Sequence, residues 1–284
     1  MLEIQDLRKT YPGFELKCSL SVPNGRITGV IGQNGAGKST LFKAILRLIR
    51  CDSGKITLLG KDIAEIEETD MMRIGSVMGE SSFSGYLSIL DIEKIMRTFY
   101  PRFQSEWFVN KCREYGLPLD QPIRGFSTGM AAKLKILQAV SYGADFLILD
   151  EPTAGLDVAA RDDILSLLRD YMKENEERSI LISLHISADL ETLCDDFYLI
   201  HKGKIVLHED TDRLLSDYAI LKVPEEAYEA LDKRYVLRTT KESYGRSCLV
   251  SQRQYYQENN PDIVMEKTGI DQVILQFIKG EDVQ

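Results

Sequence analysis

The stretch that decides the fold is Gly32-Gln33-Asn34-Gly35-Ala36-Gly37-Lys38-Ser39-Thr40. It fits the pattern G-x-x-x-x-G-K-[ST] of a phosphate-binding loop. The apolar run Ile27 to Ile31 precedes it, and apolar residues follow it at helical spacing, at Leu41, Ala44, Ile45, Leu48 and Ile49. We therefore expect the loop to join a strand to a helix, which is the context this motif requires. The alternative, a glycine-rich loop that only turns the chain, fits this context poorly.

The residue types in this loop suit a chain of phosphates. Its glycines let successive backbone N–H groups and the start of a helix face the same anion. Lys38 can reach the β and γ phosphates, and the Ser39 hydroxyl can ligate Mg²⁺.

A second candidate element is the acidic pair Asp150-Glu151, which follows the apolar run Phe146 to Leu149. A buried strand that ends here would deliver both carboxylates to the crevice where open α/β sheets bind ligands. Asp150 suits a contact to Mg²⁺ through water, and Glu151 suits orienting or deprotonating an attacking water. Taken alone, such a pair is more often an ordinary exit from a strand into a loop.

Further short apolar runs predict a parallel sheet. They lie at 180–184 and 197–200, with helical patterns between them, as expected for strands buried on both faces. Residues 86–138 are expected to be mostly helical, with breaks at proline and glycine. Lys202-Gly203-Lys204 predicts a hairpin turn. The fold class is therefore α/β.

These elements, together with Phe126-Ser127-Thr128-Gly129-Met130, the loop Ala154-Gly155-Leu156-Asp157 and His185, make residues 1–217 resemble the ATP-binding cassette (ABC) family. More narrowly, the chain resembles the nucleotide-binding subunits of bacterial ABC-2-type exporters. The resemblance implies a P-loop NTPase core, with a mostly parallel sheet, an antiparallel β subdomain and a helical subdomain at about 80–138. It also implies ATP hydrolysis that powers a separate membrane permease.

The resemblance assigns roles to three further side chains. Tyr11 corresponds to the aromatic residue that stacks on adenine, although a half-buried tyrosine near a turn is the plain alternative. Asp157 corresponds to the residue that couples the two sites of a dimer, and it could equally cap a helix that begins near Val158. His185 corresponds to the histidine that contacts the γ-phosphate, whereas most lone histidines at strand ends are structural.

The segment around Ser127 implies a dimer. In the family it opens a helix in one subunit and binds the γ-phosphate held by the other, which here would use the Ser127 hydroxyl and the Gly129 N–H. We expect a head-to-tail dimer with a second copy or a homologous ATPase subunit, and two ATP molecules between the subunits. Thr128 and Met130 depart from the usual L-S-G-G-Q, and a plain helix cap is the alternative role of Ser127.

One departure concerns the metal. The family's glutamine that contacts Mg²⁺ follows a strand that aligns with Ile74 to Val77, and this chain has Gly79 at that position. Glu80 follows and could supply a carboxylate to the metal instead. We therefore expect altered, not absent, ATPase activity.

Composition constrains partners and location. The 284 residues carry a formal charge of −9, and the five cysteines are scattered without a C-x-x-C pair. These features argue against a disulfide framework and against nucleic acid as a partner. No apolar run reaches the roughly 18 residues of a membrane span. We expect a cytoplasmic protein held at the inner face of the membrane by its permease.

The charge is uneven along the chain. Residues 97–135 have seven basic and three acidic side chains, so this segment could face anionic lipid or an acidic permease loop. Solvated faces without a partner are an equal alternative.

A single-cassette ATPase of assembly or regulation is the alternative function. A GTPase is disfavoured, because Asn110-Lys111-Cys112-Arg113 lacks the aspartate that reads guanine.

We place a domain boundary near Asp217, which separates an ATP-binding domain at 1–217 from an accessory domain at 218–284. Beyond this point no continuous buried strand is evident. Apolar positions at 235–239 and 248–250 predict a small sheet, and those from Ile270 to Ile278 predict one face of a helix. The tail is therefore expected to be a small α+β domain that supports the dimer or another accessory role.

Overall fold

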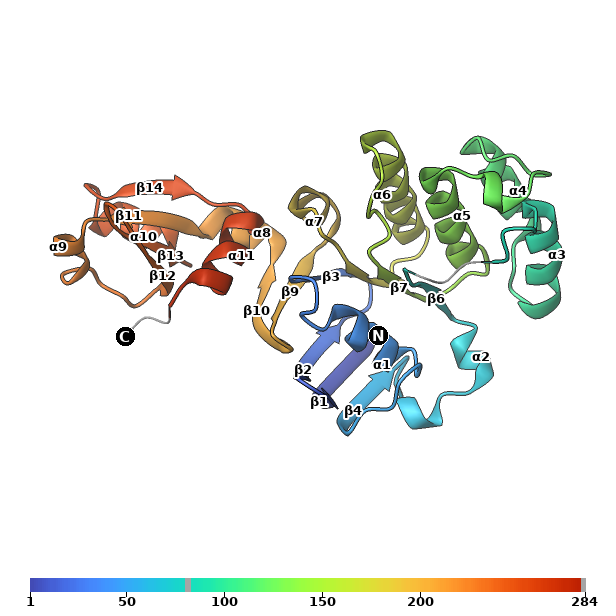
Figure 1. Ribbon diagram of the computed structural model, residues 1–284, viewed down its shortest axis with the longest axis horizontal. Helices are drawn as coiled ribbons and strands as arrows, with labels where there is room; N and C mark the ends of the chain where they lie inside the picture. The colour runs from blue at the N-terminus through green and yellow to red at the C-terminus, as the bar shows by residue number, and fades with distance from the viewer. Residues whose placement is uncertain (80–82, 282–284) are drawn as a thin grey trace.

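The fold, in a computed structural model that describes residues 1–79 and 83–281, is built on two sheets (Figure 1). The larger sheet has the strand order β5-β4-β1-β2-β10-β9-β3-β8-β7-β6, and the smaller has the order β12-β13-β11-β14. The strands of the larger sheet are β1 Leu2–Tyr11, β2 Phe14–Val22, β3 Ile27–Ile31, β4 Ser53–Leu58, β5 Lys61–Asp62, β6 Ile74–Val77, β7 Phe146–Asp150, β8 Ser179–Ser183, β9 Asp196–His201 and β10 Lys204–Asp210.

Helices pack on both faces of the larger sheet and on both faces of the smaller one. They are α1 Lys38–Ile45, α2 Glu68–Met71, α3 Ile89–Phe99, α4 Ser105–Glu114, α5 Thr128–Ser141, α6 Val158–Lys173, α7 Ser187–Leu193, α8 Thr211–Asp217, α9 Glu225–Tyr228, α10 Arg253–Asn259 and α11 Ile270–Lys279. Across residues 1–79 and 83–281, the helices are too short or too polar to cross a membrane.

The central strands are buried on both faces, as their apolar runs predict. On β7, Phe146 and Ile148 join the apolar cluster around α1, whereas Leu147 and Leu149 join the cluster beneath α5 and α6. Successive side chains of a strand point to opposite faces, so one continuous apolar run fills two cores. The strands β6, β7, β8, β3 and β9 pair in parallel in this order.

Parallel pairing brings the candidate site residues to one edge of the sheet. Ser183 on β8 is in register with Asp150 on β7 and with Val30 on β3. The glycine-rich loop begins two residues after Val30, and His185 lies two residues after Ser183. The carboxyl ends of three neighbouring strands therefore meet at the place where open α/β sheets bind ligands.

The helix after the glycine-rich loop is shorter than its pattern predicts. It ends at Ile45, and Leu48 is 62% exposed. Arg47 has φ +58, in the left-handed region that ends a run of right-handed helix. The expected helical face at Leu48 and Ile49 is therefore wrong.

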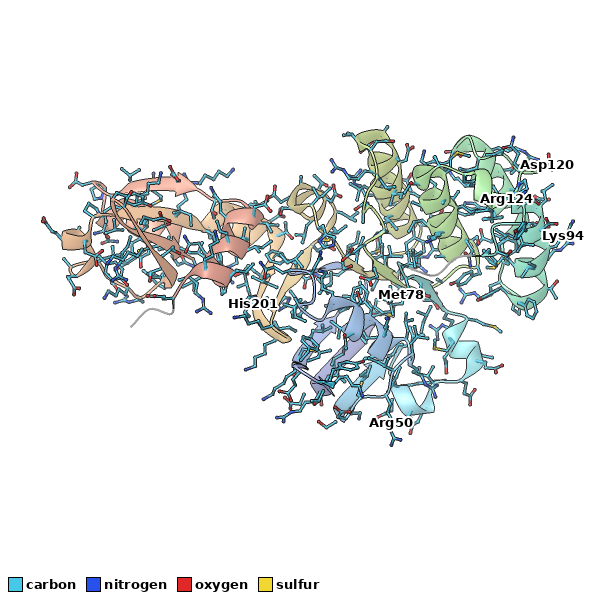
Figure 2. The ribbon with its side chains drawn as sticks, in the orientation of Figure 1. Arg50, Met78, Lys94, Asp120, Arg124 and His201 are labelled. Carbon is cyan, nitrogen blue, oxygen red and sulfur yellow. The ribbon has the colours of Figure 1, made fainter. Side chains whose placement is uncertain are left out.

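Residues 83–141 form a helical part at one end of the molecule, where Figure 2 labels Lys94, Asp120 and Arg124. Much of its basic charge is paired. Arg102 lies 3.5 Å from Asp145, and Lys133 forms an ion pair with Asp163 at 2.5 Å. Since both acidic partners lie outside residues 97–135, the net positive charge of that segment overstates what its surface offers to an acidic partner.

The smaller sheet contains a strand that the sequence pattern did not reveal. Its strands are β11 Ala219–Val223, β12 Val236–Glu242, β13 Gly245–Val250 and β14 Val264–Lys267, all antiparallel. Four of the five residues of β11 are buried, and it lies between β13 and β14. The expectation of no continuous buried strand beyond Asp217 is therefore wrong. A search for continuous apolar runs misses β11, because the polar Lys222 interrupts its run and the strand begins directly after α8.

Apolar side chains continue from one sheet to the other. Leu214, Tyr218 and Ile220 belong to the same buried cluster as Leu190 and Phe197. Ala219, Leu221 and Val223 face the other way and join a separate core with Tyr228 and Tyr256.

Candidate functional site

The glycine-rich loop is shaped to receive an anion. Gly37 has φ +117, and a Cβ there would lie 3.0 Å from the Phe14 ring and 3.1 Å from Leu16, so only glycine fits this turn. It places the first N–H groups of α1 at the loop. These groups have no partners within the helix and carry its positive dipole end.

Lys38 is folded back into its own loop. Its side chain is 4% exposed, and Nζ donates hydrogen bonds to the carbonyl oxygens of Gly32 at 2.8 Å and Gln33 at 3.4 Å. A buried ammonium group needs such acceptors. The lysine is therefore held at the loop, with its charge solvated by carbonyl groups that a phosphate oxygen can replace.

The acidic pair is held by Ser183 on the neighbouring strand. The Ser183 hydroxyl donates to Asp150 Oδ1 at 2.7 Å, and its oxygen accepts the Glu151 N–H at 2.9 Å. Asp150 is 7% exposed and Glu151 is 30% exposed. One carboxylate is thus fixed at the end of the strand, and the next points into accessible space.

Glu151 lies between two other candidate residues. Its Oε1 atom is 2.6 Å from His185 Nε2 and 3.7 Å from Lys38 Nζ. Glu151 also has φ +54, a conformation that costs energy for any residue with a side chain. The structure therefore brings together Lys38, Glu151 and His185, and it holds the backbone of Glu151 in a strained turn that aims its carboxylate at them.

Ser127 and Asp157 both cap helices. The Ser127 side chain accepts the N–H of Met130 at 3.2 Å at the start of α5, and Asp157 accepts that of Ala160 at 2.8 Å at the start of α6. Both side chains are exposed. A Cβ on Gly129 would lie 3.0 Å from the Ala160 Cβ, so the two helix starts pack closely. The capping alternatives are thus confirmed, and roles toward a nucleotide stay predictions.

Two other predicted contacts concern the edges of the site. Tyr11 ends β1 with 38% of its surface exposed, and Lys9 Nζ lies 5.4 Å from the centre of its ring. Glu80, the expected metal carboxylate, lies outside the residues that the structure describes. Its neighbour Gly79 is described, and a Cβ there would meet no atom within 4 Å.

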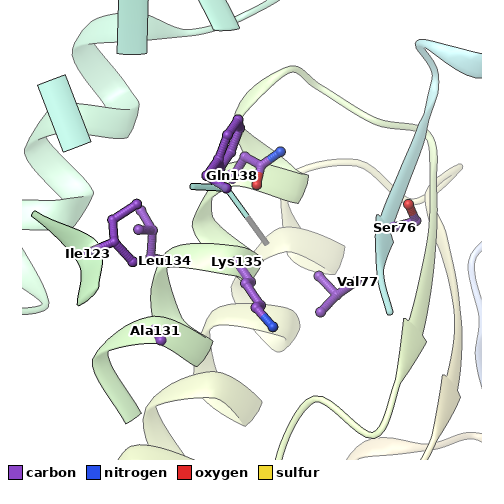
Figure 3. A pocket seen from close by; sticks show the side chains of 8 residues that line it. Ser76, Val77, Ile123, Ala131, Leu134, Lys135 and Gln138 are labelled. Carbon is purple, nitrogen blue, oxygen red and sulfur yellow. The ribbon is translucent and has the colours of Figure 1, made fainter. Parts of the chain in front are cut away.

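A cavity of about 290 Å³ lies beside the strand that leads to Gly79 (Figure 3). Ser76 and Val77 of β6 line one side, and Leu134, Lys135 and Gln138 of α5 line the other. The end of β6 and the helix that Ser127 opens are therefore neighbours.

Sequence reasoning missed Ser183 and Asp189. Asp189 is 2% exposed, and it binds the Thr153 hydroxyl at 3.2 Å and Arg161 Nε at 3.3 Å. Ser183 could have been found, because it lies near the end of the strand predicted at 180–184, two residues before His185. Asp189 offers no local signal, since its partners belong to distant segments.

Comparisons with known proteins agree with this geometry. Residues 16–154 match the family described as ABC transporter. The lantibiotic transport ATP-binding protein SrtF of Streptococcus pyogenes is 33% identical over 216 residues, which cover 75% of this chain and 92% of that protein. The chain belongs to the ABC transporter family. The bacitracin transport ATP-binding protein BcrA of Enterococcus faecalis is 30% identical over 210 residues, covering 72% of this ABC chain and 68% of that protein.

Solved structures show the same cassette. The ATP-binding subunit of an ABC transporter superposes with a TM-score of 0.67 at 26% identity, covering 75% of this chain and 91% of that one. The dimeric post-hydrolysis cassette MJ0796, bound to ADP and Pi, has a TM-score of 0.65 at 18% identity and covers 74% and 99%. This ABC subunit thus has the fold of the cassette ATPases, and it binds and hydrolyses ATP.

Proposed function

We propose that this ATPase powers export through a separate membrane permease, and that the residues gathered at the sheet edge perform the hydrolysis. The observation that carries the proposal is the position of Glu151, 2.6 Å from His185 Nε2 and 3.7 Å from Lys38 Nζ. A base, a phosphate-binding cation and a second hydrogen-bonding group at one point suit attack of water on a γ-phosphate.

In this proposal the loop from Gly32 to Thr40 binds the ATP phosphates. Lys38 exchanges the carbonyl groups of Gly32 and Gln33 for phosphate oxygens, which a short movement of its amine allows. Tyr11 stacks on adenine. Glu151 takes a proton from the attacking water, and His185 donates a hydrogen bond to the γ-phosphate.

We propose Mg²⁺ as the cofactor. The donor set fits this ion, because the Ser39 hydroxyl and the Asp150 carboxylate are hard oxygen ligands. Ser183 fixes Asp150 from Oδ1. When bound, Mg²⁺ would offset the charge of the phosphates. Glu80 remains a proposed additional ligand, and unchanged Mg²⁺ dependence in Glu80→Ala would remove it from the set.

The site requires a second subunit. Ser127, Gly129 and Asp157 are exposed or half-exposed at the starts of α5 and α6, where the helix dipoles favour an anion. We propose that they complete the site of a second copy or a homologous subunit in a head-to-tail dimer. Val158, in the first turn of α6, is an apolar residue with 73% of its surface exposed. This exposure supports a surface that the second subunit covers in the dimer.

The permease is proposed to dock on the helical part. A groove of about 760 Å³ lies between α2 and α3, and Met71, Phe99, Tyr100 and Tyr142 are among its lining residues. Phe99 is 65% exposed, which suits an apolar helix of a partner. Docking there would hold the subunit at the inner face of the membrane.

Residues 1–217 form the ATP-binding domain and 218–284 the accessory domain, supported by the change of sheet after α8. Export as the direction is supported by relatives that are named as exporters, such as the lipopolysaccharide export system ATP-binding protein LptB of Haemophilus influenzae, which is 27% identical over 233 residues.

The test replaces the general base. Glu151→Gln should keep ATP binding and lower turnover by about 10² to 10⁴, the range for losing such a base. The ATP-bound dimer should then persist in size-exclusion chromatography. Glu114→Gln, on the surface of α4, is the control and should hydrolyse ATP at the normal rate. Full activity of Glu151→Gln would refute the role of Glu151, and co-purification with a polytopic membrane protein tests the permease.

A further inference from the structure

Helix α7 begins shortly after His185 and packs on β3, the strand that precedes the phosphate-binding loop. Its first residue, Ser187, is two positions beyond His185. A Cβ on Gly29 of β3 would lie 3.1 Å from Leu190 Cδ1 and 3.2 Å from Cys194 Sγ. This close approach makes α7 part of the floor of the site.

The same helix is fastened to the catalytic segments. Asp189 binds the hydroxyl of Thr153, two residues after Glu151, and lies 3.3 Å from Nε of Arg161 in the first turn of α6. A buried carboxylate with a cation and a hydroxyl for partners is costly to disturb. Asp189 therefore holds the middle of α7 on these segments independently of Asp271.

The other face of α7 is fastened to the C-terminal sheet by α11. The Ser187 hydroxyl donates to Asp271 Oδ1, and the Ile270 N–H donates to Glu191 Oε1 at 3.3 Å. Neither helix has a side-chain cap of its own, because Ile186 and Gly269 occupy the cap positions. Asp271 of α11 therefore places a carboxylate at the start of α7, and Glu191 of α7 places one at the start of α11. The helix dipole favours a negative charge at both positions.

Apolar packing supports this exchange. Ile270 and Val273 of α11 are fully buried in the cluster that contains Leu190 and Leu193 of α7. Figure 1 shows α11 on the side of the smaller sheet that faces the larger one. The two helices are therefore expected to move as one body.

We propose that Asp271 is a positioning residue for His185, through which the C-terminal part of the chain sets the rate of ATP hydrolysis. The inference rests on the proposed role of His185 at the γ-phosphate. His185 and Ile186 are both exposed, so burial of their own side chains does not fix this stretch of backbone. The Ser187 hydrogen bond holds its far end.

The physical consequence is a loss of rate with little loss of affinity. Lys38 and the backbone of the glycine-rich loop supply most contacts to ATP, and they stay in place when Asp271 changes. The imidazole of His185 would instead occupy a wider range of positions over Glu151. Small misplacements of a catalytic group lower turnover strongly.

The experiment is a double-mutant cycle in the full chain. Asp271→Ala should lower kcat about threefold to tenfold, within the range of coupling between residues in contact, and should leave KM for ATP unchanged. Ser187→Ala should reproduce this effect from the other side. Asp271→Asn should restore the rate, because its amide oxygen still accepts the Ser187 hydroxyl. In the His185→Ala background, Asp271→Ala should have no further effect.

The matched control is Glu266→Ala. Glu266 also belongs to the C-terminal sheet, but it forms an ion pair with Lys222 on the neighbouring strand at 2.5 Å. Its loss should leave kcat unchanged. Normal turnover in both Asp271→Ala and Ser187→Ala would overturn the inference, as would an equal slowing by Asp271→Ala with and without His185.

The ATPase rate of His185→Ala distinguishes a failure of the positioning role of Asp271 from a failure of the proposed role of His185. If His185→Ala hydrolyses ATP at the full rate, the proposed role of His185 is wrong and the inference falls with it. If His185→Ala is slow and Asp271→Ala is normal, the role of His185 stands and only the positioning by Asp271 is wrong.

Discussion

The hydroxyl of Ser183 donates a hydrogen bond of 2.7 Å to Oδ1 of Asp150, across two neighbouring parallel strands. The same oxygen accepts the N–H of Glu151 at 2.9 Å. One small side chain therefore satisfies the buried carboxylate and holds the strained backbone of the residue that follows it. The position of the candidate base depends on a neighbouring strand as much as on its own.

This relationship predicts a loss of stability in Ser183→Ala. The variant leaves an oxygen of Asp150 and the N–H of Glu151 without their partner, so unfolding free energy should fall by about 1 to 3 kcal/mol. The Mg²⁺ concentration for half-maximal ATPase activity should also rise, since Asp150 is less well held. Urea denaturation and Mg²⁺ titration measure the two effects. Ser216→Ala, on the exposed face of α8, is the control, and an equal effect there would contradict the prediction.

Gly75 is required by the close packing of α5 on β6. A Cβ there would lie 2.3 Å from Leu147 Cδ2 and 2.6 Å from the carbonyl oxygen of Ala139. The backbone of α5 must shift to admit a methyl group, so Gly75→Ala should lower the unfolding free energy by about 1 to 3 kcal/mol. Gly125→Ala is the control, because a Cβ there meets no atom within 4 Å. Similar urea midpoints for the two variants would contradict the prediction, because they would show that α5 moves away from β6 without loss of stability.

The sequence predicts those elements of the fold whose structure is determined by a few neighbouring residues. The glycine-rich loop and the run from Phe146 to Asp150 each carry their signal within a few residues, and both form as expected. Strand β11 carries little signal, because its pairing partners β13 and β14 are distant in sequence.

The site divides in the same way. Lys38, Glu151 and His185 follow predicted strands or loops, so their meeting at one edge follows from parallel topology. The hydrogen bond of Ser187 to Asp271 joins residues 84 positions apart, and no local pattern contains it. Such contacts decide how firmly the predicted residues are held, and only the folded chain reveals them.

Asp70 predicts a pH dependence of stability. A hydrogen bond from the Lys61 ammonium group, with another from the Glu67 N–H, lowers the pKa of Asp70 below its ordinary value. A carboxyl group with a lowered pKa contributes stability above its ordinary pKa and loses it as pH falls through the folded-state value. The stability gap between the native chain and Asp70→Asn should therefore be full at pH 7 and close in acid.

Urea midpoints of both chains, measured from neutral pH to below the ordinary pKa of aspartate, test this. Asp262→Asn, in the exposed loop after α10, serves as the control for loss of one negative charge. A gap between the native chain and Asp70→Asn that stays constant as the pH falls would show that Lys61 does not favour the ionised form of Asp70.

The five cysteines should differ sharply in reactivity. Burial raises the pKa of Cys112 to about 12 and that of Cys248 to about 11. Burial also raises the pKa of Cys51, but this thiol is only half-buried. The thiolate is the reactive form, so a buried thiol with a raised pKa reacts slowly. At pH 8 we expect a chromogenic thiol reagent to modify Cys51 first in the native protein, and all five thiols in concentrated urea. Peptide mapping identifies the modified residue, and Cys51→Ser should remove the fast phase. Modification of Cys112 as fast as that of Cys51 under native conditions would contradict the packing of α4 against α5.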